Sequence, residues 1–132
     1  MRASGRWHTR GRRVVYCAEH PAAALLEILV HYEIDVRDLP TRYRLLRIAV
    51  PDDLAVEHVA LDVLPADWQL KTDVTRTIGD TWLAASTTAL LRVPSAVVPE
   101  TMNVLLNPGH PGAARLSITQ VSEHAIDPRL IR

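Results

Sequence analysis

Apolar residues along the chain alternate between short β-like runs and two helix-like stretches. Residues 13–18 are rich in β-branched and aromatic side chains, which is typical of a strand. His20-Pro21 begins a predicted helix that continues over residues 22–33, because proline is tolerated in the first turn of a helix and the residues after it are mostly good helix formers. This helix is apolar on nearly all sides, which predicts that it is buried.

A second helix is predicted over residues 72–85. The threonine and aspartate that open it are both able to cap its N-terminus, and Val74, Ile78 and Trp82 recur at a spacing that places them on one face. Further β-like runs occupy residues 44–50, 54–61, 89–98 (interrupted at Pro94-Ser95), 103–106 and 116–121, with a turn at Pro40 and a loop over 107–112. Strands mixed with two helices predict a compact α+β fold in one domain.

Composition narrows the class of protein. A chain of 132 residues has the length of one domain, and 48% hydrophobic with 23% charged residues is typical of a soluble globular protein. Fifteen basic and fifteen acidic residues give zero net charge, which argues against nucleic acid or a membrane surface as a partner. The sequence contains neither an apolar run long enough to cross a bilayer nor a secretory signal, so the cytoplasm is the expected location.

The cysteine and histidine content argues against a metal site. Cys17 is the only cysteine and lies in an apolar run, so we expect a small buried side chain rather than a reactive thiol. The six histidines are far apart and form no HxxxH or HxH pair.

Positive charge is concentrated near the N-terminus. Lys71 is the only lysine, and five arginines fall within the first thirteen residues. They are Arg2, Arg6, Arg10, Arg12 and Arg13. The zero net charge therefore conceals a local excess of arginine.

Glu27 is the most informative polar residue, because aliphatic side chains flank it in the sequence AAALLEILVH. Burying an ionised carboxylate without a partner costs several kcal/mol, so such a residue is normally paired or functional. Three interpretations remain open: a functional carboxylate, one half of a structural ion pair, or a residue on a narrow solvent-facing stripe with Ala23, Ala24 and His31.

Three other positions are candidates, each with an ordinary alternative. Arg6 lies between a glycine and a tryptophan in a short loop that could bring its guanidinium near Glu27, although lone loop arginines usually have no function. Tyr16 is near the end of the first strand, where a core aromatic with a hydrogen-bonded hydroxyl is the ordinary interpretation. Ser95 follows Pro94, which cannot donate to a sheet ladder, so we expect an edge or bulge with the hydroxyl facing a cleft. The chain lacks the G-x-S-x-G, P-loop and G-x-G-x-x-G sequences.

Several short segments, in their order and spacing, resemble the RES-domain family, toxins of bacterial toxin–antitoxin pairs named for an arginine, a glutamate and a serine. The segments are Gly5-Arg6-Trp7, Val14-Val15-Tyr16, Leu25-Leu26-Glu27 with Val30-His31, Leu64-Pro65 with Asp67-Trp68, Gly79 with Trp82-Leu83, Val93-Pro94-Ser95-Ala96-Val97, and Leu106-Asn107-Pro108 with His110-Pro111. The resemblance covers nearly the whole chain, 1–132.

The resemblance implies a fold similar to that of ADP-ribosyltransferases, with NAD+ as the substrate in a cleft between small β-sheets. Family members consume NAD+ by phosphorolysis, with inorganic phosphate as co-substrate, or by hydrolysis, and some transfer ADP-ribose to a macromolecule. Arg6, Tyr16, Glu27 and Ser95 match the family's active-site positions: Arg6, Glu27 and Ser95 as catalytic residues, and all four as NAD+-binding residues. Asn107 matches a further motif, to which we assign a structural role in its loop.

The chemistry of these residue types suits that reaction. Nicotinamide leaves as a neutral molecule, so catalysis must stabilise the oxocarbenium-like sugar, and the Glu27 carboxylate is able to do this. Arg6 offers a planar donor fork for the pyrophosphate or for inorganic phosphate. Tyr16 is able to stack on the nicotinamide ring, and Ser95 to hydrogen-bond the ribose or Glu27.

The resemblance also implies a partner, an Xre-like DNA-binding antitoxin that blocks the cleft, in a homo-oligomer or a toxin–antitoxin hetero-oligomer. In two places the sequence departs from the family. Gly5 comes so early that the usual N-terminal strand is expected to be missing, and His8 stands where a small polar residue such as asparagine is usual. The early position of Gly5 makes an inactive antitoxin-binding module an alternative to an NAD+-consuming enzyme. A separate alternative, implied by the resemblance, is an ADP-ribosyltransferase.

Overall fold

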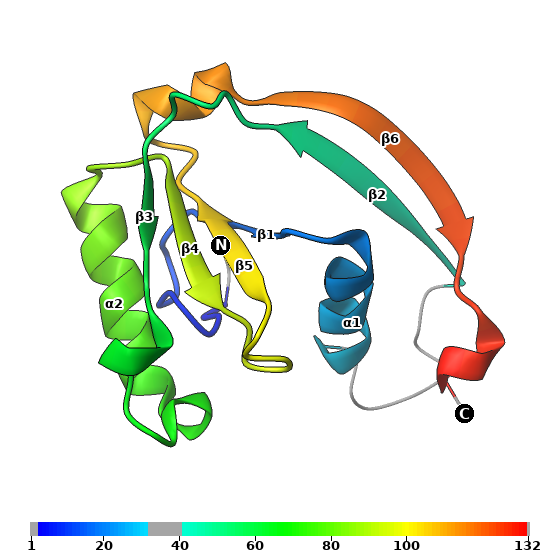
Figure 1. The fold of residues 1–132 in the computed structure, drawn as a ribbon, viewed down its shortest axis with the longest axis horizontal. Helices are drawn as coiled ribbons and strands as arrows, with labels where there is room; N and C mark the ends of the chain where they lie inside the picture. Colours follow the sequence, from blue (N-terminus) through cyan, green and yellow to red (C-terminus); the bar gives the residue numbers. More distant parts are fainter. Residues whose placement is uncertain (1–2, 32–40, 132) are drawn as a thin grey trace.

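A computed structural model describes residues 3–31 and 41–131 and gives a mixed α+β fold with two sheets (Figure 1). The four-stranded sheet has the order β1-β5-β4-β3, and a two-stranded sheet pairs β2 with β6. The strands are β1 (Val15–Ala18), β2 (Arg42–Ala49), β3 (Val56–His58), β4 (Leu90–Pro94), β5 (Met102–Leu106) and β6 (Ser117–Ala125). The helices are α1 (Pro21–His31) and α2 (Thr72–Ala85), with short 3-10 turns η2 (Leu61–Val63), η3 (Trp68–Leu70), η4 (Pro111–Arg115) and η5 (Pro128–Ile131).

The core lies between the four-stranded sheet and α2. Val93 and Leu105, on neighbouring antiparallel strands, are 0% exposed and pack in one cluster with Trp82 of α2. The helix predicted over residues 72–85 is confirmed, and Trp82 and Ile78, which the spacing placed on one face, both pack in this core. Gly79 permits a close approach of the N-terminal loop, because a Cβ atom at this position would lie 1.6 Å from the carbonyl oxygen of Trp7.

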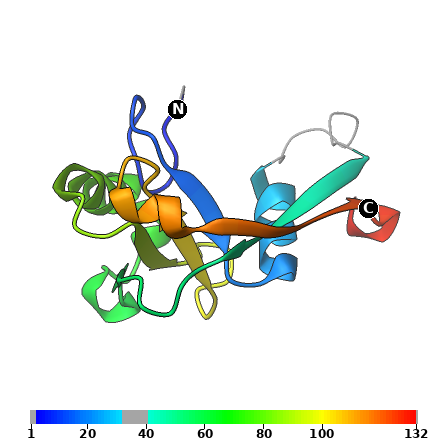
Figure 2. The same ribbon diagram turned by 90° about the horizontal axis from the view of Figure 1, so that it is seen from above.

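The sheet of β2 and β6, which we call the ribbon, has no comparable core among the described residues. Its antiparallel register is interrupted by an irregularity between Arg47 and Ile48. Leu46, Ile118 and Val121 are 52%, 58% and 58% exposed. Figure 2 shows the ribbon extending away from the four-stranded sheet and past α1.

The first predicted helix forms, but the expectation that it is buried is wrong. It begins at Pro21 as predicted, and Leu26 and Val30 are 38% and 41% exposed. The physical reason is its position: α1 follows β1 at the end of the sheet, with β1 as its main neighbour among the described elements, and is not enclosed between two layers. The predicted continuation to residue 33 and the turn at Pro40 lie outside the described residues.

The strand predictions hold in outline and fail in detail. The predicted run over 54–61 pairs with β4 only at Val56–His58, and a 3-10 turn begins at Leu61. The last strand continues past residue 121 to Ala125, because residues 122–125 pair with residues 42–45 of β2. Cys17 is half-buried rather than fully buried, and burial raises the pKa of its thiol.

Among the described residues, no helix combines the length and apolar character needed to span a membrane.

Candidate active site

The Glu27 carboxylate is attached to the sheet by two neutral donors. Ser95 Oγ donates to Glu27 Oε1 over 2.7 Å, and Asn103 Nδ2 donates to the same oxygen over 2.9 Å. Ser95 directly follows β4 and Asn103 lies in β5, so neighbouring strands supply the two donors. Glu27 forms no ion pair with any described residue. The interpretation as half of a structural ion pair therefore does not hold for this part of the chain.

Ser95 is buried, in contrast to the expectation that its hydroxyl faces a cleft. The residue is 2% exposed, and its Oγ accepts hydrogen bonds from the backbone N–H groups of Val97 and Val98 at 3.1 and 3.2 Å. Its own hydroxyl proton goes to Glu27. Pro94 is the last residue of β4, an interior strand, so the missing N–H falls at a strand end rather than at a sheet edge. The geometry suits Ser95 to orienting Glu27.

Tyr16 has a fixed hydroxyl and a partly exposed side chain. Its Oη accepts from the Trp7 backbone N–H at 3.1 Å and lies 2.6 Å from His8 Nδ1. Gly5 is required here, because a Cβ atom would lie 2.6 Å from that hydroxyl oxygen. Burial raises the pKa of Tyr16, against the effect of the Trp7 hydrogen bond and of the nearby Arg76 charge.

Arg6 is anchored away from Glu27. Its Nη1 donates to the carbonyl oxygen of Gln69 in η3 at 2.9 Å, and its own carbonyl oxygen accepts from Thr75 Oγ1 of α2 at 2.5 Å. The guanidinium of Arg76 lies nearby, since its Nε donates to the carbonyl oxygen of Gly5 at 2.7 Å. Arg6 and Glu27 are not in contact, so the expected approach of the guanidinium to the carboxylate is not seen.

One face of the sheet nevertheless connects these groups. Tyr16 pairs with Leu105, and Ala18 with Asn103. Paired residues share a face, so Tyr16 and Asn103 point to the same side as diagonal neighbours, which typically lie about 7–8 Å apart. The Tyr16 hydroxyl binds the loop that carries Arg6, and Asn103 binds Glu27. Tyr16 and Asn103 on this face therefore contact, respectively, the loop that carries Arg6 and the carboxylate of Glu27.

A comparison with protein families shows which family the chain belongs to. A family model described as the RES domain matches residues 1–127. The chain belongs to the RES-domain family. A Toxin Res from Pseudomonas putida is 48% identical over 130 residues, covering 98% of this chain and 88% of the relative.

Two further relatives of this RES domain match almost the whole chain. The Prs ADP-ribosylating toxin of a Sphingobium species is 40% identical over 132 residues, covering 97% of this chain and 81% of the relative. A Toxin Res from Yersinia enterocolitica is 35% identical over 135 residues, covering 96% and 83% respectively.

Asn103 and Arg76 are not among the residues predicted from the sequence, and His8 is noted there only as a departure from the family pattern; the structure places all three around these groups. The sequence does contain a feature that could have identified Asn103. It is a polar residue in the otherwise apolar strand Met102–Leu106, as Glu27 is in its helix. His8 is 1% exposed and bonds Tyr16 and the carbonyl oxygen of Ala3, so this departure from the family pattern is built into the loop. Nothing local marks Arg76, since its partner is 71 residues away.

Asn107 has the structural role expected of it. Its Oδ1 accepts from the Gly109 backbone N–H at 3.0 Å, and its own N–H donates to the carbonyl oxygen of Ala89 at 2.8 Å. These bonds fix the turn that follows β5.

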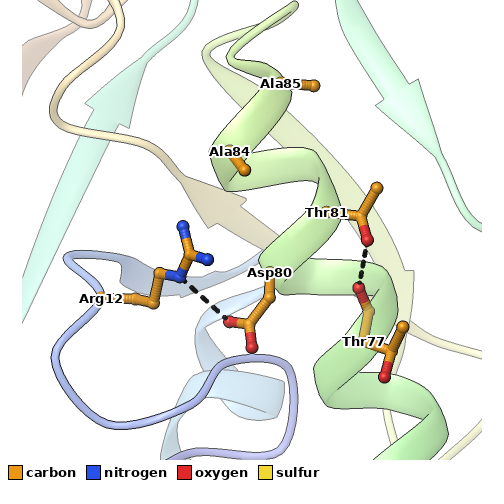
Figure 3. A pocket seen from close by; sticks show the side chains of 6 residues that line it. All are labelled: Arg12, Thr77, Asp80, Thr81, Ala84 and Ala85. Atoms are coloured by element: carbon orange, nitrogen blue, oxygen red, sulfur yellow. Dashed lines mark hydrogen bonds and ion pairs between the residues drawn. The ribbon is translucent and has the colours of Figure 1, made fainter.

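A separate hollow lies on the side of α2 (Figure 3). It has a volume of about 590 Å³ and is lined by Arg12, Thr77, Asp80, Thr81, Ala84 and Ala85. Arg12 Nε and Asp80 Oδ1 lie 3.8 Å apart across it, and Asp80 also accepts from the backbone N–H and the hydroxyl of Thr9. None of the predicted site residues lines this hollow, which we assign to the attachment of the N-terminal loop.

Proposed function

We propose that this RES domain is the toxin of a bacterial toxin–antitoxin pair and cleaves the nicotinamide–ribose bond of NAD+, by phosphorolysis or hydrolysis, so that NAD+ is depleted and growth arrested. The observation that carries the proposal is the state of the Glu27 carboxylate. Both donors bind Oε1, while Oε2 makes no hydrogen bond or ion pair within the described part of the chain. A carboxylate fixed by one oxygen and open at the other suits the stabilisation of a developing positive charge.

In this reaction the protein has two main tasks: to hold NAD+ in position and to place a negative charge beside the reacting ribose. The bond between the ribose C1′ and the nicotinamide nitrogen breaks with its electron pair going to nicotinamide, which leaves neutral. Glu27 Oε2 stabilises the oxocarbenium-like sugar that develops. An oxygen of water or phosphate then bonds to C1′, and with water the displaced proton passes to solvent.

The other predicted residues act on binding and orientation. Ser95 holds Glu27 in place rather than acting as a nucleophile, since its proton and lone pairs are already used. Arg6, fixed through Nη1 alone, retains further N–H donors for the phosphates of NAD+. The Tyr16 ring stacks on nicotinamide while its hydroxyl stays bound to the loop.

Nicotinamide release from NAD+ by the purified chain, with and without inorganic phosphate, tests the proposal. Glu27→Gln keeps an oxygen for both donors and removes the charge, so we expect a rate about 100 to 1,000 times lower, as for the loss of a group that stabilises transition-state charge. Glu123→Gln, on the exposed ribbon, is the matched control and should keep full activity. Wild-type turnover no faster than that of Glu27→Gln would contradict the proposal.

A second candidate function is transfer of ADP-ribose to a macromolecule. It is favoured by the Sphingobium relative, which is named an ADP-ribosylating toxin. Labelled NAD+ in a cell lysate should then mark a discrete band that is lost with Glu27→Gln. Release of free product alone would favour cleavage by water or phosphate.

An Xre-like antitoxin that blocks the cleft remains part of the proposal. The relatives named Toxin Res support the toxin context. An arginine-lined entrance would suit the carboxylate of an inserted chain end. Growth arrest on expression without a partner would separate an active toxin from an inactive antitoxin-binding module, which would leave growth unchanged.

A further inference from the structure

The side chain of Asn103 has an unusual hydrogen-bonding pattern. Its Nδ2 donates to Glu27 Oε1 at 2.9 Å, whereas its Oδ1 is buried and has no partner. The orientation of the amide follows from chemistry, because an ionised carboxylate only accepts hydrogen bonds and the NH2 group must therefore face Glu27. The amide satisfies Glu27 and leaves its own oxygen unpaired.

This pattern is unfavourable for the fold alone. Asn103 lies in β5 between Ala18 of β1 and Val93 of β4, and asparagine is depleted in strands. A buried acceptor without a donor costs free energy that an apolar side chain would avoid. The contact of this side chain with Glu27 is therefore the feature that accounts for an asparagine at an interior strand position.

Glu27 needs such a contact because its own helix does not fix it. α1 has exposed apolar residues on its surface, among them Leu26 beside Glu27, and is not enclosed by two layers. One hydrogen bond from Ser95 leaves the carboxylate free to rotate about the bonded oxygen. A second donor to the same oxygen, from a different strand, restricts that rotation and determines where Oε2 points.

We propose that Asn103 is a positioning residue for Glu27: with Ser95 it fixes Oε1 and turns Oε2 toward the ribose of NAD+. This inference rests on the proposed function. Asn103 acts through Glu27, so its removal should lower kcat and leave KM nearly unchanged, because the interaction that it supports is made in the transition state.

Two variants test the donor. Asn103→Ala removes it, and kcat should fall about tenfold to a hundredfold, the scale of a hydrogen bond to a charged group. Asn103→Asp keeps the shape but places a second carboxylate against Glu27. Because the two carboxylates then share a proton over part of the pH range, the acid limb of the kcat/KM profile should move upward by about one pH unit or more. Val104→Ala, at the next position of β5 with its side chain on the opposite face, is the control and should keep both kcat and the profile.

A double-mutant cycle separates positioning from a structural role. In the Glu27→Gln background, Asn103→Ala should cost little further activity, since its effect passes through the missing charge. An equal loss in both backgrounds, or an unmoved pH profile in Asn103→Asp with wild-type kcat, would overturn the inference. If Asn103→Ala does not fold, the isosteric Asn103→Asp profile decides. Absence of wild-type NAD+ turnover would instead refute the proposed function, so the two failures are distinguishable.

Discussion

The four-stranded sheet and the ribbon both carry apolar residues on their strands, yet only the sheet buries them. Val93 and Leu105 of the sheet are 0% exposed beneath Trp82 of α2. Leu46 and Val121, which face each other in the ribbon, are 52% and 58% exposed. A strand residue is buried only where a second layer covers it, and no described element covers this face of the ribbon.

The candidate site joins the two kinds of region. Glu27 belongs to α1, which is loosely covered like the ribbon, but its carboxylate is bound by Ser95 and Asn103, which belong to the packed sheet. Hydrogen bonds from the sheet, rather than helix packing, therefore place the charge. This division predicts that substitutions in the sheet affect stability, activity or both, whereas the same substitutions in the ribbon affect neither.

The largest effect is expected from Gly79→Ala, which attacks the contact between α2 and the N-terminal loop. The added Cβ would lie 1.6 Å from the Trp7 carbonyl oxygen, and a backbone atom is not easily displaced. We expect a loss of about 3 kcal/mol or more in the free energy of unfolding, measured by urea denaturation. Thr81→Ala, exposed on the same helix, is the control with an expected change within about 0.5 kcal/mol. Equal stability of the two variants would show that the loop is not packed as described.

The next effect is expected from Ser95→Ala, because this hydroxyl serves both the fold and Glu27. Its loss leaves two backbone N–H groups without their acceptor and should cost about 1–3 kcal/mol of unfolding free energy. Activity should also fall, by about tenfold or more, through the freed carboxylate. Ser122→Ala makes the same change in the ribbon, where it should alter neither quantity measurably. A Ser95→Ala variant with normal stability and turnover would contradict the assigned geometry.

Sequence patterns predicted the parts of the molecule that local chemistry determines. The proline at the start of α1 and the spacing of Val74, Ile78 and Trp82 both predicted elements that form. The exposure of α1 could not be predicted. An apolar helix surface indicates that a second layer should cover it, but the sequence pattern does not show whether that layer is present. Ser95 was expected to hydrogen-bond either the ribose or Glu27, and the structure shows its bond to Glu27. Asn103 was not expected as a partner, because it is 76 residues from Glu27 and only the sheet register brings it there.

A smaller effect is expected from Tyr16→Phe, which removes the hydroxyl that binds the Trp7 N–H and His8. Near neutral pH the variant should lose about 1 kcal/mol of unfolding free energy. The pKa of Tyr16 is raised by burial, so folding favours the neutral phenol: this stabilisation is complete below the unfolded pKa of about 10 and is lost as the pH rises through the higher folded pKa. The stability difference between wild type and Tyr16→Phe should therefore narrow above about pH 10. A difference that is constant from pH 7 to 11 would contradict the assigned burial.

The smallest effect is expected from Val121→Thr on the ribbon. Threonine has nearly the shape of valine and suits a strand, and position 121 is 58% exposed, so water solvates the new hydroxyl and the free energy of unfolding should change by less than about 0.5 kcal/mol. Val93→Thr makes the identical change at 0% exposure, where an unpaired buried hydroxyl should cost about 1–3 kcal/mol. Chemical denaturation of both variants at two protein concentrations completes the comparison. A large loss in Val121→Thr that depends on concentration would mean that a second copy of the chain covers the ribbon in solution, and the contrast between the two regions would then hold only for the single chain.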